Sequence, residues 1–164
     1  KNHDLWVGVT HHVVIPIEFS ARVEALGGRW HLLALSEDWC GDSVNIIPLV
    51  AKLAESVSNM ELRILGRDEN LDIMDTHLSG GKSRSIPIVI LLNTRFQECG
   101  WWGPRPSPLQ KWVAETGMLL PKDERHKEVR KFYARDRGLT TMEEIVGMLE
   151  KCCVTGSVGA AALS

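Results

Sequence analysis

Short apolar runs along the chain predict the strands of a central sheet. The run at 30–36 is almost wholly apolar, which is typical of a buried strand in a parallel or mixed sheet. Residues 61–65 and 86–92 predict two further strands, and Pro87 fits near a strand start because proline cannot serve a central ladder position. Residues 96–101 follow a polar turn and predict an antiparallel return.

Between these strands, apolar residues recur at helical spacing. The pattern predicts helices over 16–26, 44–57 and 71–78, after Ser107, over 122–137, and from Thr140, where Glu143 stands in capping-box spacing. Pro48 should kink the second helix because proline removes a backbone hydrogen bond. Residues 5–15, apolar and partly β-branched, are compatible with a first strand or an irregular lead-in. Residues 152–164 are small and predict a frayed tail.

Composition and charge describe an ordinary globular domain and exclude several classes of function. Hydrophobic residues make up 44% of the 164 positions and charged residues 24%, enough for one domain with a full core. The formal net charge of −2 offers no basic excess for phosphates, so we expect no nucleic-acid partner. No window approaches the roughly 18–20 apolar residues of a membrane span, so we expect no membrane partner. The chain starts without a signal-peptide pattern but also without Met, which leaves a removed leader open.

The cysteine usage favours thiol chemistry over a structural cysteine framework. Cys40, Cys99, Cys152 and Cys153 are too few for a disulfide scaffold and lack the spacing of a metal site. A reducing compartment is the simpler interpretation, so we expect a cytoplasmic protein with no metal and no cofactor.

The stretch Trp39-Cys40-Gly41-Asp42-Ser43 joins a predicted strand to the first turn of a predicted helix. Amides of a first helical turn, together with the positive end of the helix dipole, stabilise a thiolate at this place. Glu37, Asp38 and Asp42 oppose that effect with negative charge. These carboxylates suit either proton transfer to and from the thiol or helix capping and solubility, and we favour the structural role.

The order of elements and four local features resemble the thioredoxin superfamily. Trp39-Cys40-Gly41 matches the opening of its active site, and Pro48 stands where its active-site helix is kinked. Ile86-Pro87 resembles its cis-proline loop, and Gly103 resembles the glycine that lines its substrate groove. The likeness covers residues 21–117, about three-fifths of the chain.

The resemblance implies an α/β fold, a thioredoxin-like three-layer sandwich whose mixed central sheet is flanked by helices. We expect the domain at 1–120, with C-terminal helices at 121–151 packed on it and a flexible tail at 152–164. A closer likeness is to a bacterial thioredoxin-like subfamily. Its motifs match Glu37 to Asp42, Asp68 to Asp75, Ser85 to Pro87 and Trp102 to Pro106.

Two departures from the superfamily pattern restrict the chemistry. Ser43 replaces the second active-site cysteine, and Ala34 replaces the buried acid six residues before the first one. A serine hydroxyl forms no disulfide, so the protein cannot cycle as a dithiol through positions 40 and 43.

The remaining chemistry centres on Cys40, with Ser43 as the second candidate catalytic residue. Cys40 can attack the disulfide of a protein or a low-molecular-weight substrate and form a mixed disulfide that another thiol must resolve. Glutathione, a substrate thiol, or Cys152 and Cys153 are candidates, whereas Cys99 is expected to lie too far away. The commoner explanation of Cys152 and Cys153 is a pair of unpaired tail cysteines.

The predicted substrate-binding residues surround this thiol: Trp39, Gly41, Asp42, Ile86, Pro87 and Gly103. A cis Ile86–Pro87 bond would leave the backbone of Ile86 open to pair with an extended peptide. One of Trp101 and Trp102 should be in the core, because adjacent strand residues point to opposite faces. Monothiol exchange is our first hypothesis, and a non-catalytic peptide- or partner-binding module that uses this groove is the alternative. Iron–sulfur carriage is a weaker third, since its glutathione-binding residues are not evident.

Overall fold

The protein is described by a computed structural model that covers residues 2–160. Its elements follow the chain in this order: α1 (His3–His12), α2 (Ile17–Ala25), β1 (Trp30–Ser36), α3 (Gly41–Glu55), β2 (Met60–Gly66), α4 (Leu71–Asp75), β3 (Ile88–Leu92), β4 (Glu98–Trp102), α5 (Ser107–Glu115), η1 (Gly117–Leu119), α6 (Lys122–Asp136) and α7 (Leu139–Ala160). The predicted strands and the predicted helices are all present, with ends that differ by a few residues. Among the described residues, no helix is long and apolar enough to cross a membrane.

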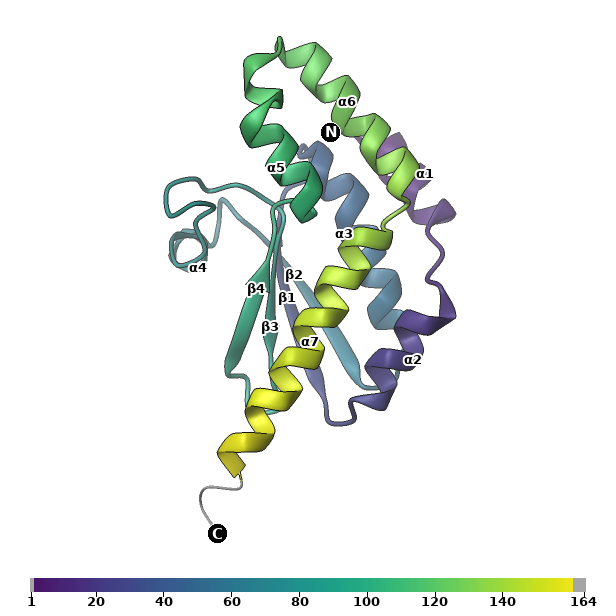
Figure 1. Ribbon diagram of the computed structural model, residues 1–164, viewed down its shortest axis with the longest axis vertical. Helices are drawn as coiled ribbons and strands as arrows, with labels where there is room; N and C mark the ends of the chain where they lie inside the picture. The colour runs from purple at the N-terminus through teal and green to yellow at the C-terminus, as the bar shows by residue number, and fades with distance from the viewer. Residues whose placement is uncertain (1, 161–164) are drawn as a thin grey trace.

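The sheet is mixed and has the strand order β2-β1-β3-β4. β1 runs parallel to β2 and antiparallel to β3, and β4 returns antiparallel to β3 as predicted. Helices α2, α3 and α7 cover one face of the sheet, and α4 lies on the other (Figure 1). This arrangement confirms the predicted α/β thioredoxin-like fold with added C-terminal helices.

The core lies on both faces of the sheet, as the alternation of β3 shows. Val89 and Leu91 join the larger cluster beneath α2, α3 and α7. Ile88 and Ile90 join a smaller cluster with Met74 of α4. A strand that is buried on both faces reads as a continuous apolar run, which is why the sequence predicted it well.

Residues 3–12 form helix α1, so the expectation of a strand or irregular lead-in over 5–15 is wrong. The helix packs on α3, and within it the Trp6 side chain contacts the edge of the core. Asp4 in its first turn and His11 and His12 in its last turn suit the helix dipole. Its β-branched residues suggested a strand, but packing on α3 decides the conformation here.

The beginning of α7 differs from the predicted capping box. Thr140 donates from its backbone amide and its hydroxyl to Asp136, the last residue of α6. Glu143 instead forms an ion pair with Arg22 of α2 at 2.7 Å. Arg22 also reaches Glu150, two turns further along α7, at 2.8 Å. This double pairing fixes α7 against α2.

Helix α7 continues to Ala160, so Cys152 and Cys153 lie within a helix and not at the start of a tail. Residues 161–164 of the predicted tail lie outside the described residues. The small residues of this segment suggested fraying. The helix is held at this point by a bond from Cys152 to the sheet, which is described below.

Candidate functional site

Cys40 stands at the N-cap position of α3, at the end of the loop that follows β1. Its side chain is partly buried against the smaller core cluster. Its Sγ atom lies 3.5 Å from the carbonyl oxygen of Ile86. Among the described residues, no side chain caps this end of α3. The amides of the first turn therefore have no side-chain acceptor, and the cysteine is the residue that precedes them.

Helix α1 holds the loop before Cys40 from one side. The Trp6 indole donates to the carbonyl oxygen of Asp38 at 3.0 Å. The Asn2 amide donates to the carbonyl oxygen of Trp39 at 3.1 Å. Sequence reasoning missed these contacts because it did not predict α1 as a helix.

The turn after β2 holds the same loop from the other side. Glu37 accepts the backbone amide of Asp68 at 2.9 Å. The Arg67 guanidinium lies 5.1 Å from the ring centre of Trp39, which is 45% exposed. Trp39 thus forms an exposed wall beside the thiol.

Ile86, Pro87 and Gly103 meet beside Cys40, as the sequence predicted. The Ile86–Pro87 and Gly103–Pro104 peptide bonds are both cis, and Ile86 and Pro87 are buried. Gly103 has a φ of +134°, and a Cβ atom there would lie 2.3 Å from the carbonyl oxygen of Pro87. Only glycine fits this close approach of two backbone segments.

Asp42, predicted from the sequence as a substrate-binding residue, is buried in a cluster with Arg105 and Tyr133. The Tyr133 hydroxyl donates to Asp42 Oδ1 at 2.8 Å, and Arg105 Nη2 lies 2.6 Å from Oδ2. Asp42 is 8% exposed, so a role in solubility is excluded. Arg105 and Tyr133 were missed because contacts between α3, the loop after β4 and α6 leave no local pattern.

The burial of Tyr133 predicts an unusual alkaline titration. Burial raises the pKa of its hydroxyl well above the ordinary value, and the negative charge of Asp42 raises it further. A raised pKa in the folded state adds to the free energy of unfolding. This contribution is complete below about pH 10, where the tyrosine of the unfolded chain is also protonated, and it is lost as the pH rises further. Tyr133 is the only tyrosine in the chain, so tyrosinate absorbance reports this residue alone. We expect that absorbance to appear only together with loss of the circular dichroism signal. Ionisation near pH 10 in the folded protein would contradict the burial.

Ser43 is completely buried within the first turn of α3. Its hydroxyl has no hydrogen-bond partner among the described residues. The neighbouring predicted residue Gly41 is exposed. Of the two candidate catalytic residues, Cys40 is therefore the accessible one.

Cys99 and Cys152 form a disulfide between β4 and α7. This pairing corrects the expectation that Cys152 is an unpaired tail cysteine. The beginning of β4 lies level with the beginning of β1, because Leu92 pairs with both Glu98 and His31. Cys40 follows the opposite end of β1. The disulfide therefore stands at the far end of the sheet, and Cys152 is not placed to resolve Cys40. Cys153 lies beside it, with Sγ 3.8 Å from the carbonyl oxygen of Leu26.

Two pockets lie around α5, and one of them borders the site. A pocket of about 540 Å³ is lined by residues that include Trp101, Gly103 and Arg105. Trp102 is in the core and Trp101 is partly buried, in accord with the predicted alternation. This pocket runs from Gly103 along α5 as far as Glu115.

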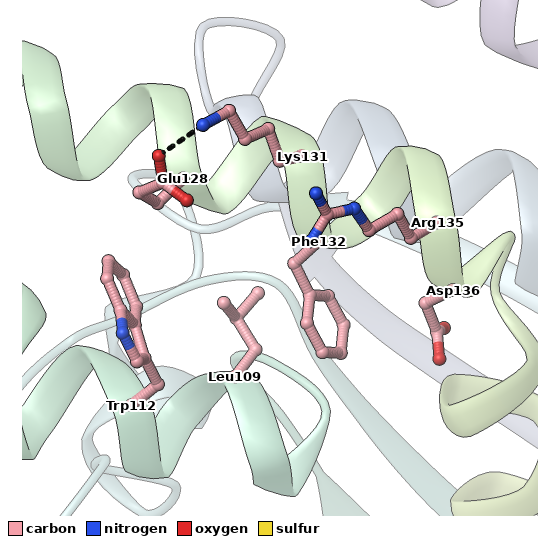
Figure 2. A pocket seen from close by; sticks show the side chains of 7 residues that line it. All are labelled: Leu109, Trp112, Glu128, Lys131, Phe132, Arg135 and Asp136. Atoms are coloured by element: carbon pink, nitrogen blue, oxygen red, sulfur yellow. Dashed lines mark hydrogen bonds and ion pairs between the residues drawn. The ribbon is translucent and has the colours of Figure 1, made fainter.

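The second pocket, of about 430 Å³, lies between α5 and α6 and contains none of the predicted site residues. Figure 2 shows Leu109, Trp112 and Phe132 forming its apolar wall. Phe132 lines this pocket, and the next residue, Tyr133, donates to Asp42. This packing on α5 holds α6 so that Tyr133 faces Asp42.

The mixed sheet, the cysteine at the start of α3 and the adjacent Ile86-Pro87 segment define a protein of the thioredoxin-fold class. A family model described as thioredoxin, Thioredoxin_9, matches residues 1–143, and the chain belongs to this family. A comparison with curated proteins found no match.

Solved structures share the fold at low sequence identity. The chain is similar to PA1234, a protein of unknown function from Pseudomonas aeruginosa, with a TM-score of 0.72 and 17% identity over 92% of this chain and 84% of that one. It is also similar to an HIV epitope-scaffold, with a TM-score of 0.69 and 17% identity over 92% and 85% of the two chains. At this level of identity the likeness shows the fold alone.

Proposed function

We propose that the protein is a monothiol thiol–disulfide exchange protein in which Cys40 is the nucleophile. The observation that carries the proposal is the position of Cys40 Sγ, at an uncapped helix start and 3.5 Å from the carbonyl oxygen of Ile86. A thiolate is stabilised at such a place. The Ile86 backbone can align a substrate chain beside the sulfur.

The reaction has two exchange steps, and no electrons are lost or gained overall. The Cys40 thiolate attacks one sulfur of a substrate disulfide, forms a mixed disulfide and releases the other sulfur as a thiolate. An external thiolate then attacks the mixed disulfide, takes the substrate sulfur and frees Cys40. The second thiol must come from outside the site, because position 43 is a serine and Cys152 is bonded to Cys99.

The substrate surface in this proposal consists of Trp39, the Ile86-Pro87 segment, Gly103 and the pocket that continues past Arg105. This surface suits a peptide or a small disulfide with an apolar part. The 45% exposure of Trp39 supports a contact with the substrate.

An exchange assay tests the proposed function. The protein is mixed with a peptide–glutathione mixed disulfide and excess reduced glutathione, and release of the peptide thiol is followed over time. We expect the wild type and Cys153→Ser to accelerate release, and Cys40→Ser to return the rate to the background reaction. Equal rates for the wild type and Cys40→Ser would rule out exchange. Retained peptide binding by Cys40→Ser would then favour the non-catalytic binding module.

A further inference from the structure

Asp42 is a buried carboxylate in the first turn of α3, two residues beyond Cys40, and it is 8% exposed. A buried carboxylate acts through a medium of low dielectric constant, so its field is screened less than that of an exposed one. Without compensation, this charge would oppose formation of the Cys40 thiolate. Asp42, Arg105 and Cys40 all act on Tyr133: its pKa is raised by burial, by Asp42 and, least, by Cys40, and is lowered by Arg105.

Other charged groups face the same region but lie nearer to the surface. The Glu37 carboxylate accepts a hydrogen bond from the backbone amide of Asp68, and the Asp38 side chain is exposed. Arg67 pairs with Asp68 at 2.7 Å while it lies over Trp39. The Arg67 charge offsets that of Asp68. The charges of the exposed Asp38 and the half-buried Glu37 are screened by solvent more than a buried charge is. Asp42 is therefore the carboxylate whose compensation has the largest effect on the thiol.

Arg105 supplies that compensation from the loop between β4 and α5. Its Nη2 contacts Asp42 Oδ2 at 2.6 Å, and its Nη1 donates to Gln110 of α5 at 3.2 Å. The Nε atom is buried and has no hydrogen-bond partner among the described residues. The guanidinium is thus directed at the carboxylate, while Tyr133 donates to the other oxygen.

We propose that Arg105 is a positioning residue for the Cys40 reaction: it neutralises the buried Asp42 charge and thereby keeps the thiol ionisable. Tyr133 holds the Asp42 carboxylate in place for this pairing. Helix α6 thereby contributes the Tyr133 side chain to the proposed site. The inference rests on the proposed function only in taking Cys40 as the reactive thiol.

The test measures how the iodoacetamide alkylation rate of Cys40 depends on pH, with the Cys40 peptide quantified by mass spectrometry. We expect Arg105→Gln to move the midpoint of this curve up by about one pH unit, since an unpaired neighbouring charge shifts a titration by that much or more. Asp42→Asn should move it down. The double variant, in which neither charge remains, should return it close to the wild type.

Two further variants separate charge from structure. Arg105→Lys keeps the charge but loses the planar fork, and it should stay close to the wild-type midpoint. Arg29→Gln removes an arginine that pairs with Glu61 at the opposite end of the sheet, and it should change nothing. Equal midpoints for Arg105→Gln and the wild type would overturn the proposal, and so would an upward shift in Asp42→Asn.

Circular dichroism shows which variants are folded. If Arg105→Gln fails to fold, Asp42→Asn and the double variant still give the sign of each charge effect. Alkylation needs no disulfide substrate, so it is independent of the exchange assay. Shifted midpoints without exchange would support the charge compensation and refute the proposed function. Disulfide exchange with unshifted midpoints would support the proposed function and refute the charge compensation.

Discussion

Replacing Gly103 by alanine is expected to destabilise the protein by about 3–5 kcal/mol, because backbone strain and a steric clash act together. The φ of +134° is unfavourable for any residue with a Cβ atom, and that atom would meet the Pro87 carbonyl oxygen at 2.3 Å. The contact is backbone against backbone, so no side-chain rotation relieves it. The Pro87 segment would have to move, and the carbonyl oxygen of Ile86 would move away from Cys40.

Gly100→Ala is the matched control on the same strand, β4. A Cβ atom at Gly100 would lie 3.4 Å from the sulfur of Met148, which is a flexible side chain. Urea unfolding at equilibrium should therefore show a much smaller loss for Gly100→Ala than for Gly103→Ala. Similar losses for the two variants would contradict the close packing of Gly103 on Pro87.

Opening the Cys99–Cys152 disulfide is expected to lower the free energy of unfolding by about 4 kcal/mol, as loop-closure entropy predicts for this separation. The bond closes a loop with a sequence separation of 53 and joins the edge strand β4 to α7. Its loss restores conformational freedom mainly to the unfolded chain.

The measurement compares urea unfolding with and without a reducing agent. The wild type should lose stability on reduction. The Cys99→Ser/Cys152→Ser variant should have the same, lowered free energy of unfolding with and without the reducing agent. Cys153→Ser leaves the bond intact and should respond to the reductant as the wild type does. No effect of the reductant on the wild type would show that the bond does not stabilise the fold.

The sequence predicted the fold well where the pattern is local. The strand at 30–36 has the predicted bounds, since continuous apolar runs signal strands buried on both faces. The resemblance to the thioredoxin superfamily predicted that Cys40, Pro87 and Gly103 lie at a common site. In the structure Cys40 contacts the Ile86-Pro87 segment, and Gly103 packs on Pro87.

Features that depend on distant contacts were not predictable from local patterns. Helix α1 resembles a strand in composition and is helical because it packs on α3. The Asp42 cluster joins residues that are 63 and 91 positions apart in the chain. Cysteine spacing alone does not define a disulfide pairing, so Cys99 and Cys152 could not be matched in advance.

These distant contacts change the interpretation of the site. The superfamily's buried acid is replaced by Ala34, which is fully buried on β1. A different buried acid, Asp42, stands within the active-site turn and carries its own cation and hydroxyl donor. The candidate site therefore has one thiol and a buried carboxylate paired with Arg105 and Tyr133, where the superfamily pattern has two thiols and an acid at the position of Ala34.

Trapping a mixed disulfide identifies the sulfur that attacks the substrate. The protein is incubated with glutathione disulfide, quenched with acid, and mapped by peptide mass spectrometry. We expect one glutathione on the Cys40 peptide, its removal by reduced glutathione, and no adduct at this position in Cys40→Ser. An unmodified Cys40 peptide, with glutathione only at Cys153 or on no cysteine, would contradict the claim that Cys40 is the exchange nucleophile.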